Sequence, residues 1–480
     1  MPKMKDTIVM FPSPEISHLI SMVELGKLIL HHHPQYSVTI LLTTGLVDPT
    51  TMTPYINRIS QANPSIVFHQ LPFLPTPPDK SPLRSHLAIL FESLRMYTPN
   101  VRNALQSISL SSTIQSFIIG IFCFSSFDVG SHFQIPTYFF YSSAVVSLAP
   151  ILYFPILHSQ TSQNFKDLTT TYLDIPGVPR IRGSHMGEAV VNRADPAYYE
   201  FLDLATHLPK SKGIISNTFE SLEPIPIKAT ADGACIPHAP TPPVYCIGPL
   251  IADGEVTMKS GHECLSWLNA QPSRSVVFLC FGSRGVFSAL QLKEIAHGLE
   301  KSGQRFLWVV KSPPPTEKEK TLGFSSLASK ELELDSLLPE GFLNRTRDRG
   351  LVVKSWAPQA AILNRESVGG FVTHCGWSSV LEAICAGVPM LAWPLYAEQH
   401  INKAGLVEDM KLAMPMEQAE NGFVSAIEVE KRVRALMESE DGKTLREQSR
   451  KMRENAQVAL AKGGSSVEAL RKLVESWNPN

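Results

Sequence analysis

The segment that decides the fold is WAPQAAILNRESVGGFVTHCGWSSVLEAICAGVPMLAWPLYAEQ, residues 356–399. Its apolar run at residues 370–373 predicts a buried strand, and the polar residues 374–377 that follow predict a tight turn. A short apolar helix is expected at residues 380–386, and a second apolar run, 388–395, returns to the sheet. The segment therefore predicts a strand–turn–helix–strand unit.

The two ends of this helix carry further signals. Ser379 and Glu382 have the spacing of a capping box, and Gly387 stands where a C-cap glycine belongs. A helix N-terminus at the end of a buried strand offers free backbone N–H groups and the positive end of the helix dipole to an anion. His374 and Ser378 add side-chain donors to Ser379 at this point. The pattern predicts a pyrophosphate site.

The whole segment resembles, without a gap, the signature of the plant family 1 (secondary-product) UDP-glycosyltransferases, which use UDP-sugars. The resemblance is strongest in the C-terminal half but covers nearly the whole chain. It implies contacts with a UDP-sugar for Trp356, Ala357, Gln359, His374, Gly376, Trp377, Ser378, Ser379, Glu382, Glu398 and Gln399.

The resemblance also implies roles within this set. Trp356 is expected to stack on the uracil, with Ala357 and Gln359 at the base and ribose. Glu382 is expected to bind the ribose hydroxyls, whereas Trp377, Glu398 and Gln399 bind the sugar and His374, Ser378 and Ser379 bind the pyrophosphate. Trp377 and Gln399 are typical of relatives that use UDP-glucose. The family usually has Asn where this chain has Ser378, which is a shorter donor.

Composition limits the other possibilities. The chain has 480 residues, which favours two domains, and its net charge of −1 gives no electrostatic reason to bind nucleic acid or an anionic membrane. Its seven cysteines form no CxxC pair and no zinc spacing, which is typical of a reduced cytoplasmic protein. No apolar segment is long enough to insert stably in a membrane. We expect a monomer that needs no metal and no cofactor besides its donor substrate.

Strands and helices alternate along both halves of the chain, which predicts an α/β fold with parallel sheets. The expected strands lie at residues 7–11, 37–42, 65–71, 115–122, 137–141, 276–281 and 306–310. The Pro-rich stretch 237–243 is the predicted linker. The fold of the resembling family, GT-B, has two such Rossmann-like domains facing across a cleft. It implies an acceptor-binding domain at 1–240, completed by the C-terminal helix at about 460–480, and a UDP-sugar-binding domain at 241–460.

Two further turns follow predicted strands. Gly282 and Ser283 come directly after the strand at 276–281, where a glycine lets the backbone approach a ligand closely. The resemblance implies that this turn meets the diphosphate. It also implies that Ser142, after the strand at 137–141, contacts the sugar.

Transfer of a sugar to a hydroxyl group needs a base that removes the hydroxyl proton. His18 lies where the first helix is expected to begin, and a histidine with its ordinary pKa of about 6.5 suits neutral pH. The resemblance implies that His18 is this base, in an inverting reaction. Relatives usually have two glycines before the histidine, whereas this chain has Glu15 and Ser17. Glu15 either lines the acceptor site or faces water.

A second departure concerns the partner of this base. Relatives have an Asp that orients the catalytic His and stabilises its charged form, and this chain has Gly120 at the matching position. Asp128 lies eight residues further along in a predicted helix and is not expected to replace it. Nearby, Phe122 and Phe124 either stack on a phenolic acceptor or pack in the core.

Three interpretations follow. We favour O-glucosylation of a phenolic or flavonoid-type acceptor, with a water or another polar side chain orienting His18. The first alternative is C-glucosylation of an acidic polyphenol, whose anion carries negative charge on a ring carbon and needs little help from a base. The second alternative is a nucleotide-sugar binding protein with little turnover. An oxidoreductase is disfavoured because no GxGxxG follows the first strand.

Overall fold

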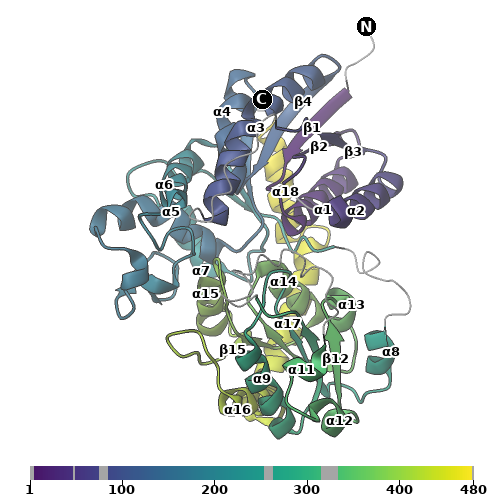
Figure 1. Ribbon diagram of the computed structural model, residues 1–480. Helices are drawn as coiled ribbons and strands as arrows, with labels where there is room; N and C mark the ends of the chain where they lie inside the picture. The colour runs from purple at the N-terminus through teal and green to yellow at the C-terminus, as the bar shows by residue number, and fades with distance from the viewer. Residues whose placement is uncertain (1–4, 47–48, 75–84, 253–262, 315–332, 478–480) are drawn as a thin grey trace. The chain divides into compact units, whose positions relative to one another are not determined.

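The computed structural model describes residues 5–46, 49–74, 85–252, 263–314 and 333–477 (Figure 1). The chain forms two compact units. The first comprises residues 1–252 and 455–480, and the second comprises residues 253–454. Each unit contains a parallel sheet with helices packed around it, as the alternation of strands and helices predicts.

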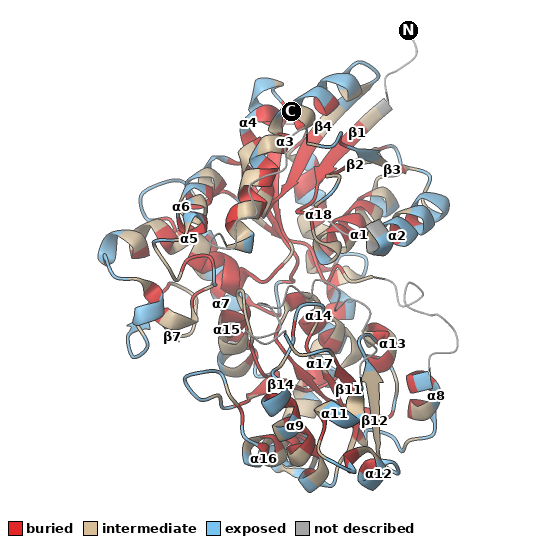
Figure 2. Ribbon diagram, viewed as in Figure 1, coloured by how far each residue is buried: buried red, intermediate tan, exposed pale blue. Residues whose placement is uncertain are grey.

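The sheet of the first unit has seven strands, and every neighbouring pair is parallel. Its spatial order is β3 (Ile66–Gln70), β2 (Ser37–Leu42), β1 (Lys5–Phe11), β4 (Ser112–Gly120), β5 (Thr137–Tyr141), β8 (Ile214–Ser216) and β9 (Val244–Cys246). The central strands are buried over most of their length (Figure 2). Phe11 pairs with Ile119 and Gly120 pairs with Phe140. The register therefore brings the carboxyl ends of β1, β4 and β5 to one edge of the sheet.

Helices connect these strands in the first unit. They are α1 (Ile16–His32), α2 (Pro49–Ala62), α3 (His86–Ser109), α4 (Phe127–His132), α5 (Val145–Gln160), α6 (Pro196–His207) and α7 (Pro224–Ala231). Short 3-10 helices lie at Ile121–Ser126, Phe165–Asp167, Gly183–His185 and Leu208–Lys210. A two-stranded antiparallel hairpin joins β6 (Tyr172–Leu173) to β7 (Ile181–Arg182).

The last helix of the chain, α18 (Ser465–Glu475), belongs to the first unit and lies beside its sheet in Figure 1. At its N-terminal end, the hydroxyl of Ser466 donates to the carbonyl of Gly248 at 2.6 Å. Just past its C-terminal end, Ser476 Oγ and Tyr138 Oη are 2.7 Å apart. These contacts fasten the two ends of α18 to the segment after β9 and to β5.

The second unit has a six-stranded parallel sheet. Its spatial order is β12 (Gly350–Lys354), β11 (Arg305–Val310), β10 (Val276–Cys280), β13 (Val368–Thr373), β14 (Met390–Ala392) and β15 (Ala413–Pro415). Its helices are α8 (Glu263–Asn269), α9 (Ala289–Ser302), α11 (Leu334–Leu337), α12 (Phe342–Thr346), α13 (Gln359–Leu363), α14 (Trp377–Ala386), α15 (Gln399–Ala404), a π-helix (Gly405–Asp409) and α16 (Ala426–Glu438). The long α17 (Glu440–Leu460) leads back toward the first unit along the chain.

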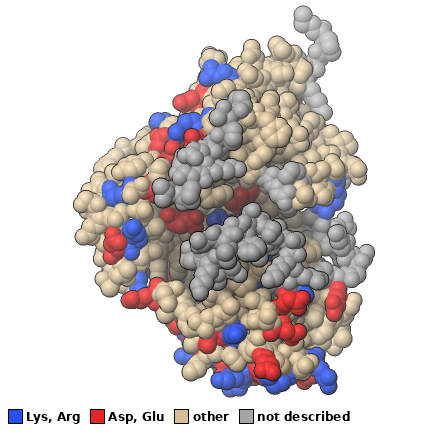
Figure 3. All heavy atoms as spheres, in the orientation of Figure 1, with Lys and Arg blue, Asp and Glu red and all other residues tan. Residues whose placement is uncertain are grey.

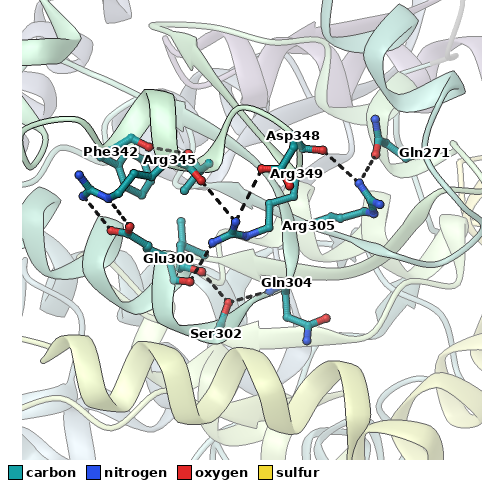
Figure 4. A network of polar contacts seen from close by, with 11 residues as sticks. Gln271, Glu300, Ser302, Gln304, Arg305, Phe342, Arg345, Asp348 and Arg349 are labelled. Atoms are coloured by element: carbon teal, nitrogen blue, oxygen red, sulfur yellow. Dashed lines mark hydrogen bonds and ion pairs between the residues drawn. The ribbon is translucent and has the colours of Figure 1, made fainter.

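A polar network fixes the C-terminal end of α9 in the second unit (Figure 4). Glu300 accepts two hydrogen bonds from Arg345, at 2.5 and 3.1 Å, and its backbone carbonyl accepts another from Arg349 at 3.0 Å. Arg305 joins Gln271 to the carbonyl of Asp348. These contacts tie the end of α9 to α12 and to the chain before β12.

The chain organisation differs in detail from the expectation. The Pro-rich stretch 237–243 leads directly into β9 of the first sheet, and Pro243 accepts a hydrogen bond from Ile214. The first unit therefore extends beyond the expected boundary at residue 240, to residue 252. The strand predicted at 115–122 ends at Gly120, where the chain turns into a 3-10 helix.

A buried carboxylate fixes the start of α5. Glu223 accepts hydrogen bonds from the backbone N–H groups of Val145, at 3.0 Å, and Val146, at 2.8 Å. These are free N–H groups of the first helical turn, which a carboxylate satisfies. Burial raises the pKa of Glu223, and the hydrogen bonds oppose that shift. Because α5 follows β5 after only three residues, the same contacts also hold the loop 142–144.

Candidate functional site

The candidate residues lie on loops at the carboxyl edges of the two parallel sheets, which is where α/β sheets bind their ligands. In the first unit these are the loops after β1, β4 and β5. In the second unit they are the segments after β10, β12, β13 and β14.

His18 is the third residue of α1 in the first unit. Its Nδ1 lies 2.6 Å from Ser142 Oγ, and its Nε2 lies 3.9 Å from a carboxylate oxygen of Glu15. The edge of its ring meets Phe122, with the ring centroids 5.7 Å apart and the planes at 87°. The imidazole is therefore held on one nitrogen by a hydroxyl group and flanked by a carboxylate and an aromatic ring.

The backbone before His18 does not require the two glycines that relatives usually have there. Glu15 is the N-cap residue of α1 and has an extended conformation, with φ −137° and ψ 148°, which any residue adopts. Ser17 is exposed, so its side chain meets no obstacle. The departure from the family's pattern thus leaves the start of the helix intact.

Gly120 ends β4 in tight contact with the loop after β1. A Cβ atom built on Gly120 would lie 2.6 Å from both the backbone nitrogen and the hydroxyl oxygen of Ser13. Ser13 is buried, so it cannot turn away into solvent. The backbone of this loop therefore leaves no room for a side chain at position 120.

Ser142 and the residues after it are held firmly. The carbonyl of Ser143 accepts a hydrogen bond from Ser216 at 2.8 Å. The hydroxyl group of Tyr141 donates to Ser147 at 2.9 Å, across the start of α5. Together with the contacts of Glu223, these bonds fix the position from which Ser142 reaches His18.

Four phenylalanines form a cluster beside His18: Phe91, Phe122, Phe124 and Phe201. Phe122 is half-buried and joins the cluster to the imidazole, with Phe91 and Phe201 within 6.0 Å of it between ring centroids. Phe124 is only 3% exposed and packs on Phe91 and His207. The structure therefore places Phe122 next to the histidine and Phe124 in the core.

In the second unit, α14 begins at Trp377 and has Gly376 as its N-cap, with no side-chain cap. The predicted capping box is wrong, because Ser379 and Glu382 both accept hydrogen bonds from Gln359 Nε2, at 2.9 and 2.8 Å. Gly387 does end the helix, in the left-handed conformation with φ 72°. The N–H groups of the first turn of α14 therefore have no side-chain cap.

His374 lies between this N-terminus and the turn after β10. A Cβ atom on Gly282 would lie 2.5 Å from His374 Nε2, and one on Gly376 would lie closer still. Burial, with a smaller effect from the charge of Lys311, lowers the pKa of His374 to about 4. The ring is therefore neutral at pH 7, and its buried Nδ1 has no hydrogen-bond partner in the part of the chain that the structure describes.

Lys311, the residue after β11, is a site residue that the sequence did not reveal. Its ammonium group donates to the carbonyl of Gly282 and, at 2.7 Å, to the carbonyl of Ser283. Burial lowers its pKa. In a trans peptide the N–H points opposite to the C=O, so these bonds turn the N–H groups of Ser283 and Arg284 away from the lysine. The turn thus presents backbone donors on its other side.

The turn before α14 is strained and supported from within. Cys375 has a positive φ of 66°, which is uncommon for a residue with a side chain. Thr373 Oγ1 accepts from its N–H at 3.3 Å, and Asn402 donates to its carbonyl at 3.0 Å. Backbone strain of this kind is typical of functional turns. Asn402, on α15, would not be found from its position in the sequence.

The remaining residues predicted to bind the UDP-sugar follow β12, β13 and β14 of the second unit. Trp356 is 54% exposed, whereas Ala357 and Trp377 are buried. Glu398 is the N-cap residue of α15. Gln399 is buried, and its Oε1 accepts hydrogen bonds from the backbone N–H groups of residues 395 and 396, which leaves Nε2 as its donor group.

Glu382 carries a perturbed carboxyl group. Burial raises its pKa to about 7, against the opposing hydrogen bond from Gln359. A carboxyl group with this pKa is partly protonated at neutral pH, so it can both donate and accept hydrogen bonds.

The described residues show neither a one-sign charged face in Figure 3 nor a metal-ligating group. Lys and Arg are interspersed with Asp and Glu on the face shown in Figure 3. Within the described ranges, no group of three or more His, Cys, Asp or Glu is placed to hold a metal ion, and no helix is long and apolar enough to cross a membrane.

Comparisons with known proteins identify the family. A family model described as "UDP-glucoronosyl and UDP-glucosyl transferase" matches residues 237–444. UDP-glycosyltransferase 88F3 of Pyrus communis is 52% identical over 485 residues, covering 98% of this chain and 100% of the relative. Phloretin 2'-O-glucosyltransferase of Malus domestica is 52% identical over 487 residues, with the same coverage. The chain belongs to the UDP-glycosyltransferase family.

Solved structures of UDP-glycosyltransferases have the same fold. The structure of Phytolacca americana UGT2 complexed with UDP-2fluoro-glucose and pterostilbene has a TM-score of 0.86 and 33% identity, covering 98% of this chain and 99% of that one. The GT-B fold inferred from the sequence is confirmed. So is the prediction that the chain is a UDP-sugar-dependent glycosyltransferase.

Removing the charge of Lys311 tests its role in the turn. We expect Lys311→Met to weaken UDP binding about 10-fold, because the carbonyls of Gly282 and Ser283 lose their donor and the turn loses its orientation. Isothermal titration calorimetry with UDP measures this change. The control is Lys354→Met, which removes an exposed charge at the end of the neighbouring strand β12. Equal affinities in the two variants would contradict the role of Lys311.

The raised pKa of Glu382 predicts a pH-dependent stability. Its folded-state pKa of about 7 exceeds the ordinary value of 4.5, so folding favours the protonated carboxyl group. The resulting contribution to the free energy of unfolding is fully present below pH 4.5 and is lost as the pH rises through 7. Relative to Glu382→Gln, the wild-type free energy of unfolding should fall by up to about 3 kcal/mol between these pH values. Thermal denaturation of both proteins without nucleotide at pH 5 and pH 8 measures the difference. Parallel pH profiles would refute the assignment.

Proposed function

We propose that this UDP-glycosyltransferase transfers glucose from UDP-glucose to a hydroxyl group of a phenolic or flavonoid-type acceptor, with inversion, and that His18 is the base. The observation that carries the proposal is the position of His18: its ring is fixed by Ser142 on one nitrogen and lies against Phe122. A base held beside an aromatic surface suits an acceptor with an aromatic ring and an acidic hydroxyl group.

The reaction needs one proton transfer and one substitution. His18 Nε2 takes the proton of the acceptor hydroxyl while its oxygen forms a bond to the anomeric carbon of glucose. The bond from that carbon to the diphosphate oxygen breaks on the opposite face, and UDP leaves with the electron pair. The imidazolium then returns its proton to solvent. A histidine is suited to this exchange because its pKa lies close to neutral pH.

The second unit supplies the donor site in this proposal. The uncapped N-terminus of α14 and the N–H groups of the Gly282–Ser283 turn receive the diphosphate, an arrangement suited to an anion. Neutral His374 adds a donor through the tautomer that carries its proton on Nε2. Gly376 keeps the space beside this ring open, and Ser378 and Ser379 extend the set of donors.

The remaining residues of the proposed donor site bind the nucleoside and the sugar. Trp356, which is exposed, stacks on the uracil in this proposal, with Ala357 and Gln359 beside the base and ribose. Glu382 binds the ribose hydroxyls, which its partly protonated carboxyl group can both donate to and accept from. Trp377, Glu398 and Gln399 face the glucose, with Gln399 donating from Nε2 because its Oε1 is engaged by the backbone.

The acceptor class is supported by the relatives and by the residues around His18. The Malus domestica relative at 52% identity is a phloretin 2'-O-glucosyltransferase, and the Phytolacca americana structure contains pterostilbene. In this chain, Phe122 and Phe201 are the half-buried members of the phenylalanine cluster and supply a surface for an aromatic ring. The carboxylate of Glu15 lies at the same place, 3.9 Å from His18 Nε2, and can accept a hydrogen bond from a second hydroxyl group.

One observation favours a second candidate, C-glucosylation of an acidic polyphenol. Gly120 provides no carboxylate for His18, so the base is less strongly activated than one paired with an Asp. A polyphenol that is already ionised needs little help and carries negative charge on a ring carbon. We retain O-glucosylation as the main proposal because His18 has a partner in Ser142.

The proposal includes a monomer in the cytoplasm. All seven cysteines are free thiols, and five of them are buried, as expected for a protein in a reducing compartment. The large exposed hydrophobic side chains of the described residues are dispersed over many elements, which gives no single apolar patch for a partner. Size-exclusion chromatography with light scattering tests the monomer.

One set of incubations tests the reaction and the base. The purified protein is mixed with UDP-glucose and a panel of dihydrochalcones, flavones and simple phenols, and the products are analysed by mass spectrometry before and after acid hydrolysis. We expect acid-labile O-glucosides. We also expect His18→Ala to lower kcat at least about 100-fold while UDP binding is unchanged, because only the proton transfer is lost.

The matched control is His31→Ala, an exposed histidine on the same helix, which should keep wild-type activity. Acid-stable products would move the assignment to C-glucosylation. Wild-type turnover by His18→Ala would refute the role of His18, and the absence of any product with phenols would refute the acceptor class.

A further inference from the structure

The partner of a catalytic histidine decides which of its two nitrogens is free to act as a base. A neutral imidazole carries one proton, and a partner that accepts a hydrogen bond at one nitrogen keeps the proton on that nitrogen. A serine hydroxyl group can accept from a protonated ring nitrogen or donate to an unprotonated one, so its direction at Nδ1 is what the experiment has to establish. In this chain the group on Nδ1 of His18 is the hydroxyl group of Ser142, at 2.6 Å. The two residues are 124 positions apart and are joined only because β1 and β5 both flank β4.

A carboxylate has no place at the end of β4. Any side chain at position 120 would begin with a Cβ atom 2.6 Å from the backbone nitrogen of Ser13, and that atom belongs to the loop that leads into α1. A real Cβ atom does not approach a backbone atom so closely. As the loop after β1 lies in this chain, it leaves no room for a side chain at position 120.

The hydroxyl group of Ser142, in the loop after β5, is well placed to orient His18 in place of a carboxylate. Ser142 follows a strand that is buried along its whole length, and Glu223 and Ser216 hold the residues after it. A side chain on so rigid a support loses little freedom when it bonds to the imidazole. This separates Ser142 from an ordinary surface serine.

We propose that Ser142 is the positioning residue of His18: it accepts the hydrogen of Nδ1–H, keeps Nε2 unprotonated toward the acceptor, and thereby replaces an acidic partner. The inference rests on the proposed function, in which His18 is the base. It differs from the contact with the sugar that the family resemblance implies for Ser142.

The proposal has a chemical consequence. Ser142 is neutral, so it fixes the tautomer but supplies no charge to stabilise the imidazolium that forms when Nε2 takes the proton. Its contribution should therefore be largest for acceptors with the least acidic hydroxyl groups. It should vanish for an acceptor that is already ionised, because no proton then remains to be taken.

The test is kinetic and uses a series of substituted phenols of falling hydroxyl pKa with UDP-glucose as donor. For the least acidic phenols, Ser142→Ala should lower kcat about 10- to 100-fold with the KM for UDP-glucose unchanged. The loss should shrink toward none for phenols that are ionised at the assay pH. Ser142→Thr keeps a hydroxyl group and should recover most of the activity.

Two comparisons make the result specific. Ser143→Ala removes the next hydroxyl group, which faces Ser147 at 3.3 Å, and any loss it causes should be the same for all phenols. Gly120→Asp should lower the thermal stability and give no gain in kcat, because its Cβ atom meets Ser13.

The outcomes separate the two proposals. A Ser142→Ala loss that is equal for all phenols, or that appears as a raised KM for UDP-glucose, would mean a contact with the sugar and would overturn the positioning role. If His18→Ala keeps full activity with the least acidic phenol, the base itself is wrong, whatever Ser142 does. A misfolded Ser142→Ala variant leaves Ser142→Thr to decide: inactivity of the folded Thr variant would also count against the proposal.

Discussion

The in-register pairing of β1, β4 and β5 is the constraint on which the predicted site of the first unit depends. Three parallel strands that are buried on both faces must end together at one edge, so the loops that follow them are forced into contact. One loop brings His18, the second brings Gly120, and the third brings Ser142. Their closeness follows from the sheet, and the residue types decide the chemistry.

In the second unit, burial determines the protonation of the side chains at the predicted site. It keeps His374 neutral and raises the pKa of Glu382, so the groups around the predicted diphosphate and ribose are hydrogen-bond donors with little negative charge. The cation of this region, Lys311, acts through the backbone by turning two carbonyls toward itself. A doubly charged leaving group would meet dipoles that are already oriented, which stabilises charge without reorganisation.

Much of this could be predicted from the sequence, because strands and glycine-ended helices are local features. The strand before His374, the helix after it and Gly387 all follow from short patterns. The predicted capping box is wrong because a residue that is distant in the sequence intervenes. Ser379 and Glu382 have the right spacing, but Gln359 reaches them from twenty residues away and takes both oxygens.

Long-range contacts limit prediction in the first unit too. The absence of the Asp is visible in the sequence, but the contact between His18 and Ser142 is not, since it spans 124 positions. The sequence also gave no sign that Ser13 fills the space beside Gly120. Glycine at that position predicts a weakened base, and in the structure the hydroxyl group of Ser142 lies 2.6 Å from Nδ1 of His18.

The central claim is that Ser142 selects the tautomer of His18, and nitrogen NMR tests it directly. Protein labelled with [15N]histidine would be compared with the His18→Gln variant to assign the two ring nitrogens of His18. At a pH where the ring is neutral, the account predicts a protonated Nδ1 and an unprotonated Nε2, with the preference lost in Ser142→Ala. A proton on Nε2 in the wild type, or a spectrum of His18 that is unchanged in Ser142→Ala, would contradict it.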